Sequence, residues 1–282
     1  MADLGKWNRL PVLRETAPGL YLDGGTSGEI LLPHRYMAKG TVPGDVINVF
    51  IYRDSEDRII ATTETPKALV GDFACLEVVS LHPRAGAFLD WGLSKDLLLP
   101  FAEQEGRLRV GDRIVVFVQL DDRTGRIAAS MRLNRALRKT PPDYALGEEV
   151  NLLVYEKTPL GYNAIVENSH KGLLFHDQLS APLSIGQKLR GFVRAVRPGG
   201  KIDLSLDASG YQRVAPLTGQ ILQLLERNGG RMSFDDASSP ESIRQRFACS
   251  KKAFKQALGS LYKQRRIKFP PTGGTELIKP NP

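Results

Sequence analysis

The sequence predicts a mainly β protein with a small α+β domain at its C-terminal end. Three stretches of the chain share one pattern, in which runs rich in β-branched residues alternate with short turns. The last stretch differs, because its apolar residues recur at the three- and four-residue spacing of helices. The net charge also distinguishes this last stretch from the three repeats. Residues 211–282 hold 13 Lys and Arg against 5 Asp and Glu, a balance of +8 that equals the net charge of the whole chain.

The three repeats are marked by glycines at matching places. They begin "GLYLDGG", "GAFLDWG" and "GYNAIVEN", at Gly19, Gly86 and Gly161. A second glycine precedes a long apolar run in each repeat, at Gly44, Gly111 and Gly186, with spacings of 67 and 75 residues. Units of this length are too long for solenoid repeats and fit small independent domains.

Each repeat contains about five short strands, which suits a small closed barrel with few open edges. One strand precedes the first glycine, at 7–15, 73–82 and 149–157. Two later runs are separated by turn residues and predict hairpins, 45–52 with 59–63, 112–120 with 127–131 and 187–196 with 202–206. Polar, proline-bearing junctions then divide the chain into barrels at 1–66, 67–140 and 141–208.

The remaining domain, 213–282, predicts a winged helix. Helical spacing runs through 218–230, and a Ser-Pro-Glu start signal opens a second helix near Pro240. A third helix follows from Ser250, and the segment 267–278 predicts two short strands around a Gly-Gly turn. Helix, short strand, helix, helix and hairpin is the element order of a winged helix.

Composition points to a cytoplasmic binding protein. Cys75 and Cys249 are isolated, as expected in a reducing compartment, and no run approaches the roughly 20 apolar residues of a membrane span. The sequence contains no phosphate-binding loop, no nucleophile elbow and no HExxH motif, and its four histidines are scattered. We therefore expect no enzyme activity, no cofactor, no metal site and no membrane partner. A basic domain of this kind is the electrostatic signature of a protein that binds a polyanion, most often nucleic acid.

The second repeat carries the residues of a known domain. "GAFLDWG", "DLLLP" and "VGDRIVVFVQLDDRTGRIAAS" resemble the S1-type RNA-binding domain, an OB-fold barrel. Three such units followed by a basic winged helix resemble the bacterial CvfB (YitL) family of RNA-binding regulators. The resemblance implies three tandem S1-type OB-fold barrels followed by a winged helix, single-stranded RNA as the ligand, and regulation of gene expression after transcription.

In the S1-type domain, nucleic acid crosses a barrel face with two aromatic residues, a histidine and an Asp–Arg pair. Carried onto this chain, those positions give candidate RNA-binding residues in each barrel. They are Phe88, Trp91, Asp122 and Arg126 in the second, Tyr21, Asp54 and Arg58 in the first, and Phe175, Arg197 and Lys201 in the third. The histidine position is Leu32 in the first repeat, Leu99 in the second and Phe175 in the third. This comparison ranks the second barrel first, the third next and the first last.

The basic C-terminal domain, which we also call the tail, supplies a further set of candidates. Lys251, Lys252 and Lys255 lie off the apolar stripe of the third helix of this domain, and Arg265 and Arg266 lead into the hairpin. Cations there can neutralise phosphates. Two alternatives stay open at this point, a transcription regulator that binds DNA through the winged helix and a scaffold that docks on the ribosome or RNA polymerase.

Overall fold

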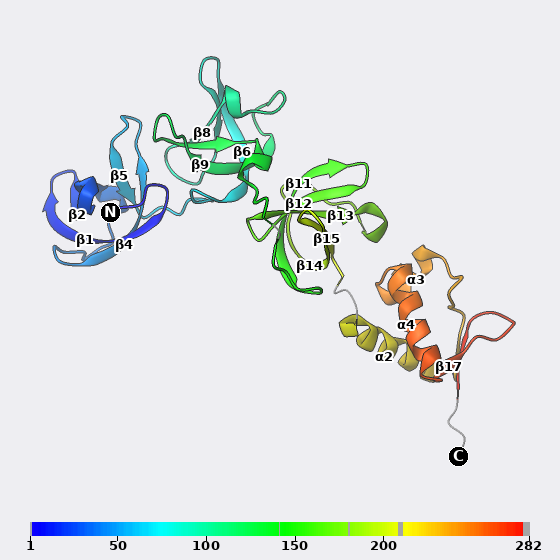
Figure 1. Cartoon of the computed structure of the whole chain (residues 1–282). Coiled ribbons are helices and arrows are strands. Elements are labelled where there is room, and N and C mark those ends of the chain that lie inside the picture. The colour runs from blue at the N-terminus through cyan, green and yellow to red at the C-terminus, as the bar shows by residue number, and fades with distance from the viewer. Residues whose placement is uncertain (1, 141, 180, 208–210, 279–282) are drawn as a thin grey trace.

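Four units follow one another along the chain in an elongated arrangement (Figure 1). The computed structural model describes residues 2–140, 142–179, 181–207 and 211–278. The first three units are five-stranded β barrels and the fourth is a winged helix, as the sequence predicts. Within the described ranges, no helix is long and apolar enough to cross a membrane.

The first barrel is closed, with strand order β1-β2-β3-β5-β4. Its strands are β1 (Trp7–Thr16), β2 (Gly19–Asp23), β3 (Glu29–Pro33), β4 (Val46–Arg53) and β5 (Ile59–Thr62). The third barrel repeats this order. Its strands are β11 (Glu149–Thr158), β12 (Gly161–Val166), β13 (His170–Phe175), β14 (Lys188–Arg197) and β15 (Lys201–Ser205).

The second barrel is a five-stranded sheet of order β10-β9-β6-β7-β8, whose end strands β8 and β10 contact each other without a hydrogen-bonded ladder. Its strands are β6 (Phe73–His82), β7 (Gly86–Leu89), β8 (Leu97–Pro100), β9 (Arg113–Leu120) and β10 (Ile127–Ser130), and the short helix α1 (Leu133–Ala136) follows them.

The repeated glycines have a common structural role. The first glycine of each repeat lies where a Cβ atom would come within 2.2 Å of a carbonyl oxygen on the facing strand, at Leu32, Leu99 and Leu174. The second glycine of each repeat has a positive φ, and its N–H donates to the residue at the β-bulge of the first strand. In the first barrel this is Gly44 to Val12, at 2.8 Å. Only glycine fits both demands without strain, so these positions mark the fold in the sequence.

The first two barrels are joined by a buried ring. Trp91 is 3% exposed and packs in one cluster with Phe50 of the first barrel. The indole Nε1–H donates to the carbonyl oxygen of Ala68 at 2.7 Å, which satisfies the one polar group of the side chain.

The second and third barrels meet through an apolar cluster and one asparagine. The cluster consists of Phe73, Val115, Leu133, Leu137, Leu153 and Ile165. At its edge the side chain of Asn168 accepts from the N–H of Phe73 at 2.8 Å and donates to Gly71 O at 3.1 Å. Adjacent barrels therefore share a buried interface to which both contribute side chains.

The winged helix has a core of its own. Its elements are α2 (Tyr211–Arg227), β16 (Arg231–Met232), α3 (Pro240–Phe247), α4 (Lys251–Lys263), β17 (Ile267–Lys268) and β18 (Thr275–Leu277). The helix α2 begins at Tyr211, ahead of the predicted start of helical spacing at 218. Ser239 and Ser250 cap α3 and α4 by accepting from backbone N–H groups. Among the side chains that the structure describes, the core cluster of this domain runs from Leu217 to Ile267.

Candidate nucleic-acid interface

The outer face of the first barrel carries an aromatic ring between charged and apolar neighbours. Strand alternation turns Leu20 and Leu22 inward, where both are fully buried, and leaves Tyr21 half-buried on the outside. The guanidinium of Arg14 lies 4.2 Å from the centre of the Tyr21 ring and pairs with Glu29 at 2.6 Å. On β3, Leu31 is the ladder partner of Tyr21. One ring face and one aliphatic side chain thus share this surface.

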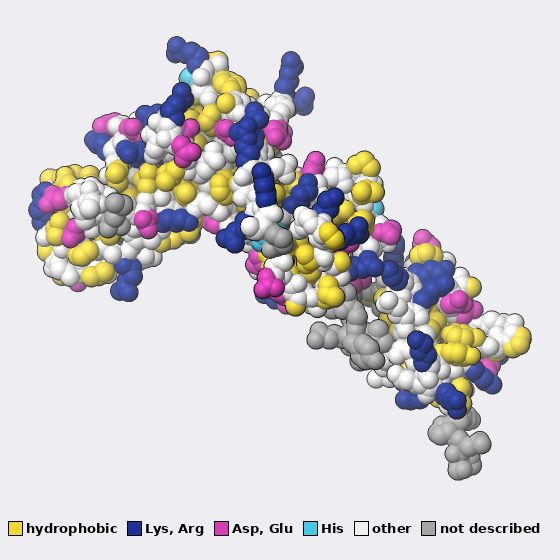
Figure 2. Space-filling model, viewed as in Figure 1, with side chains coloured by type: hydrophobic (Ala, Val, Ile, Leu, Met, Phe, Trp, Pro, Cys, Tyr) yellow, Lys and Arg dark blue, Asp and Glu magenta, His cyan; other side chains and the backbone are white. Residues whose placement is uncertain are grey.

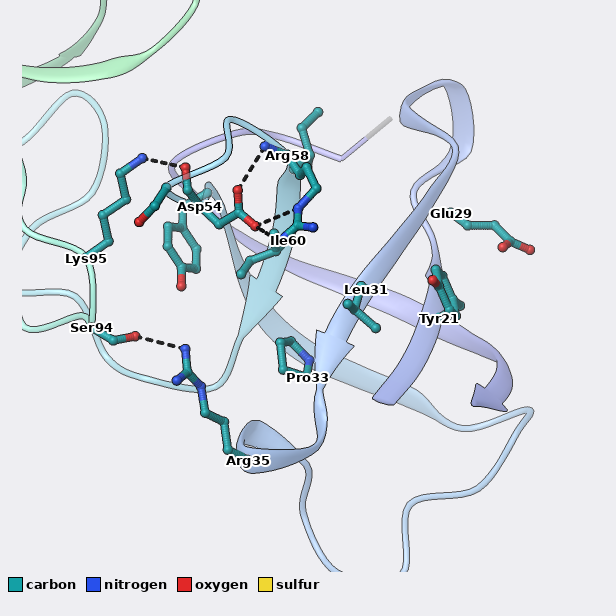
Figure 3. Close-up of a pocket in the computed structure, with 13 residues that line it drawn as sticks. Tyr21, Glu29, Leu31, Pro33, Arg35, Asp54, Arg58, Ile60, Ser94 and Lys95 are labelled. Atoms are coloured by element: carbon teal, nitrogen blue, oxygen red, sulfur yellow. Dashed lines mark hydrogen bonds and ion pairs between the residues drawn. The ribbon is translucent and has the colours of Figure 1, made fainter. Parts of the chain in front are cut away.

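A hollow of about 540 Å³ lies beside this ring (Figure 3). One part of its wall is apolar and is formed by Tyr21, Leu31, Pro33, Ile59 and Ile60. The rest is polar and is formed by Glu29, Arg35, Tyr52, Asp54, Ser55, Arg58, Ser94 and Lys95. The three residues predicted for this barrel, Tyr21, Asp54 and Arg58, all line the same hollow.

The predicted Asp–Arg pair of the first barrel is formed at the β4–β5 turn. Asp54 Oδ2 accepts from Arg58 Nε at 2.9 Å and from Nη2 at 2.7 Å, while Oδ1 accepts from the N–H groups of Glu56 and Arg58. Burial of the Asp54 carboxylate raises its pKa, but these hydrogen bonds outweigh burial, so the pKa lies below its ordinary value. The carboxylate therefore stays charged and holds the Arg58 guanidinium in a fixed place over the hollow.

The second barrel closes one side of the hollow. The Lys95 ammonium donates to the carbonyl oxygens of Arg53 at 2.9 Å and Asp54 at 2.7 Å, across the joint between the barrels. Ser94 Oγ lies 2.5 Å from the hydroxyl of Tyr36 and receives a 3.4 Å hydrogen bond from Arg35. Burial lowers the pKa of Lys95.

A buried tyrosine also lines the hollow. The Tyr52 side chain is 2% exposed, and burial raises the pKa of its hydroxyl to about 12, so the hydroxyl is a neutral donor and acceptor at physiological pH. The site is thus composite, with its apolar wall from one barrel and part of its polar wall from the next.

The hollow combines a flat apolar surface with cations at its rim. A ring and aliphatic side chains offer a flat apolar surface for a base, and cations at the rim are placed for phosphate oxygens. Lys95, Ser94 and Arg35 were not among the predicted residues. Ser94 and Lys95 come from the neighbouring barrel, so no spacing within one repeat points to them. Arg35 lies in the same barrel, in the 3₁₀ turn His34–Tyr36 that follows β3, outside the motif positions used for the prediction.

In the second barrel, the expectation that Trp91 is an exposed stacking ring is wrong. Phe88 lies on the outer face of β7, half-buried between its ladder partners Ser80 and Leu98. The chain leaves β7 after Leu89, and Trp91 turns into the joint with the first barrel. The two rings do not share a face, because burying the large indole stabilises the contact between barrels.

The predicted Asp122–Arg126 pair is also wrong. Asp121 occupies the position of Asp54, since its N–H donates to Arg126 O at 2.8 Å as that of Asp54 donates to Arg58 O. The turn is one residue longer than in the first barrel. Among the described residues, Arg126 instead pairs with Asp57 of the first barrel, at 3.0 Å, while Asp122 is exposed and makes no ion pair. The hydrogen bond from Arg126 lowers the pKa of Asp57.

The strand register also corrects the residues assigned to the histidine position of the S1-type domain. Leu32 and Leu99 point into the barrels and are buried. Phe175 pairs with Gly161 as Pro33 pairs with Gly19, so it corresponds to Pro33 and not to Leu32. A one-residue shift in a strand moves a side chain to the other face, and the alignment of short motifs does not resolve that shift.

The third barrel brings together part of its predicted set. The Arg197 guanidinium lies 6.0 Å from the centre of the Phe175 ring, and its Nε donates to Asp203 Oδ2 at 2.8 Å. Lys201 is exposed and is the ladder partner of Arg197. Tyr162 is buried inside the barrel, whereas Phe175 is half-buried.

Lysine and arginine side chains are spread over the winged helix (Figure 2). Lys252 and Lys255 are exposed on α4, Lys255 lies 3.8 Å from Asp236, and Lys251 is half-buried with its ammonium 3.4 Å from Ala237 O. Arg265 and Arg266 are exposed just after α4. The tail thus presents its predicted cations at both ends of α4.

Comparison with known proteins gives these units names. The S1 domain model matches residues 4–64 and 70–132, and the model of the CvfB-like winged helix domain matches 219–277. YitL of Bacillus subtilis is 29% identical over 93% of this chain and 90% of its own length. Conserved virulence factor B of Staphylococcus aureus is 25% identical over 84% of this chain and 80% of its own.

A solved structure also matches along the chain. It is a multidomain protein with nucleic acid binding domains from Streptococcus pneumoniae, and the match covers 98% of both chains at 25% identity with a TM-score of 0.41. The S1 and CvfB-like domain matches and the relatives along most of the sequence carry the assignment: this chain belongs to the CvfB (YitL) family.

Proposed function

We propose that the protein binds single-stranded RNA across the hollow of its first barrel and regulates gene expression after transcription. The observation that carries this proposal is the position of Tyr21, Asp54 and Arg58 around one hollow of nucleotide size. The resemblance to the CvfB (YitL) family supports the regulatory role.

The ligand is a single strand because the hollow accepts a base by its flat face. In a duplex those faces are covered by neighbouring bases, and exposing one requires unstacking. The Asp54–Arg58 pair holds a guanidinium at the rim, where it can bind phosphate or lie over a base. RNA is favoured over DNA because the polar wall offers hydroxyl and carboxylate groups that can bond a ribose 2′-OH.

The first barrel thereby becomes the leading candidate, ahead of the second. Trp91 and Arg126 of the second barrel are both engaged in the joint, and Phe88 is its remaining predicted ring. The third barrel stays a secondary candidate through Phe175, Arg197 and Lys201.

The test compares the affinity of the full chain for single-stranded RNA, single-stranded DNA and duplex DNA of equal length at one salt concentration. We expect RNA to bind most tightly and Tyr21→Ala with Arg58→Ala to weaken it. Phe101→Ala, an exposed ring of the second barrel, and Arg190→Ala, a surface arginine paired with Glu149, are matched controls.

The outcomes separate the alternatives. Tighter, sequence-dependent binding of duplex DNA would favour a transcription regulator that uses the basic helix α4. A larger loss for Phe88→Ala than for Tyr21→Ala would move the site to the second barrel. No binding of any oligonucleotide would leave a docking scaffold as the function.

A further inference from the structure

Two exposed aromatic rings lie where α4 ends and the wing begins. We use "wing" for β17, β18 and the residues between them. Tyr262 is 56% exposed and Phe269 is 42% exposed. The rings are stacked, with centroids 5.5 Å apart and an angle of 26° between their planes. The core of this domain uses other rings, Phe247 and Phe254, which are buried. Leaving two large rings in water is unfavourable, so a ligand for their outer faces is expected.

Unpaired cations follow the rings. Lys263, Arg265 and Arg266 are exposed, and within the described part of the chain they form no ion pair. The wing's own acid, Glu276, is already paired, with Lys268 at 3.2 Å and Arg231 at 3.6 Å. A helix C-terminus favours positive charge, which accounts for cations at this place but not for the rings beside them.

The backbone after α4 adds an independent observation. The N–H of Arg266 donates to Leu261 O and that of Arg265 to Tyr262 O, both at 2.9 Å, which is a Schellman motif. Arg265 occupies the left-handed position of this motif, with φ +56°. Glycine is the usual residue there because a Cβ atom is disfavoured. The chain therefore has a cation, three residues after Tyr262, at a position whose backbone favours glycine.

We propose that Tyr262 and Phe269 form a stacking platform for an unpaired base of single-stranded nucleic acid, with Lys263, Arg265 and Arg266 binding the adjacent phosphates. This deepens the proposed function and rests on it, because it assigns the winged helix a single strand instead of a duplex. Every base has a flat face that an aromatic ring can cover. The platform is a second site, in addition to the hollow of the first barrel. It lies about 15 Å along the axis of α4 from the predicted cation Lys252.

The first test removes the rings without changing the charge. In the full chain, Tyr262→Ala with Phe269→Ala should lower the affinity for a single-stranded oligoribonucleotide by roughly 5- to 100-fold. The slope of log affinity against log salt should stay unchanged, because no phosphate contact is lost. An abasic oligonucleotide of equal length should bind the variant and the wild type equally. Exchanging the rings, Tyr262→Phe with Phe269→Tyr, should restore binding, whereas Lys263→Ala with Arg266→Ala should flatten the salt slope.

The second test separates binding from stability. Arg265→Gly should raise the melting temperature of the winged helix by about 4–8 °C, as a relieved left-handed residue does in a small domain, and at the same time weaken oligonucleotide binding. Circular dichroism follows this domain, since α2, α3 and α4 are the long helices of the described chain. Trp7 and Trp91 fluorescence follows the first two barrels. A residue with only a structural role would change the melting temperature alone.

Equal affinity of the ring-deletion variant and the wild type for the base-bearing oligonucleotide would overturn the platform. If Tyr21→Ala weakens binding in the same assay, the proposed function stands and the platform alone fails. If the wild-type chain binds no single strand, the proposed function and the platform fail together.

Discussion

Trp91 of the second barrel packs edge-on against Phe50 of the first, with ring centroids 5.5 Å apart and planes at 83°. Phe50 in turn lies 6.0 Å from Trp7. The three rings form the joint that holds the two barrels in one orientation. The hollow depends on that orientation, because Ser94 and Lys95 of the second barrel line it.

Replacing Trp91 by Ala should lower the free energy of unfolding of this pair of barrels by about 3–5 kcal/mol, the usual loss when a large buried ring is deleted. Denaturant unfolding monitored by Trp7 fluorescence measures the loss at the joint itself. Phe88→Ala, a half-buried ring on the outer face, is the control and should cost less. Normal unfolding of the Trp91 variant would contradict the buried position of this ring.

Lys95→Met should weaken the joint while keeping the apolar stem of the side chain. It removes the two hydrogen bonds to Arg53 O and Asp54 O, and a hydrogen bond from a charged group contributes about 1.5–3 kcal/mol. We expect lower stability and weaker RNA binding together, measured by chemical unfolding and by titration. Lys67→Met removes a more exposed lysine, paired with Asp90, and should leave RNA affinity unchanged.

Asp54→Asn should change the acid stability of the first barrel. The folded-state pKa of Asp54 lies below its unfolded value, so its contribution is complete above about pH 4 and is lost as the pH falls through the folded-state pKa. The wild-type free energy of unfolding should therefore fall more steeply in acid than that of the variant. At neutral pH the variant should lose about 1 kcal/mol, because Arg58 is largely exposed and its pairing is screened.

Glu56→Gln is the matched control for this measurement. This substitution removes one charge from the same turn. The Glu56 carboxylate also pairs with Arg58, at 2.8 Å, but it is largely exposed. An acid profile of Asp54→Asn that coincides with that of the wild type would contradict the assigned hydrogen bonds.

Removing residues 211–282 should leave the three barrels folded, because the described core of the winged helix is made of its own residues, Leu217 to Ile267. RNA affinity should fall and its salt dependence should flatten, since fewer phosphates are neutralised. Affinity measured from about 50 to 200 mM salt on both chains gives the two slopes. An unchanged slope would make the tail a protein-docking domain.

Local patterns in the sequence are enough to divide this protein into its units. Strand pairing within each barrel joins segments close in the chain, so the alternation of apolar residues and the glycines Gly44, Gly111 and Gly186 specify each unit locally. The winged helix followed from helical spacing and from the Ser and Pro signals near Pro240. Tyr21, Asp54 and Arg58 could also be named in advance, because all three lie within one repeat.

Contacts between the units set how the barrels meet and which face stays open. Trp91 reads from the sequence as a surface ring at a strand end, but burial against Phe50 turns it into the joint. Arg126 forms its ion pair with Asp57 of the first barrel and not with an acid of its own turn. Lys95 reaches the hollow from the second barrel, about 40 residues along the chain from the carbonyls it binds. Contacts between separate cores have no periodic signal in a single sequence, because they depend on which surfaces bury the most apolar area when whole barrels dock.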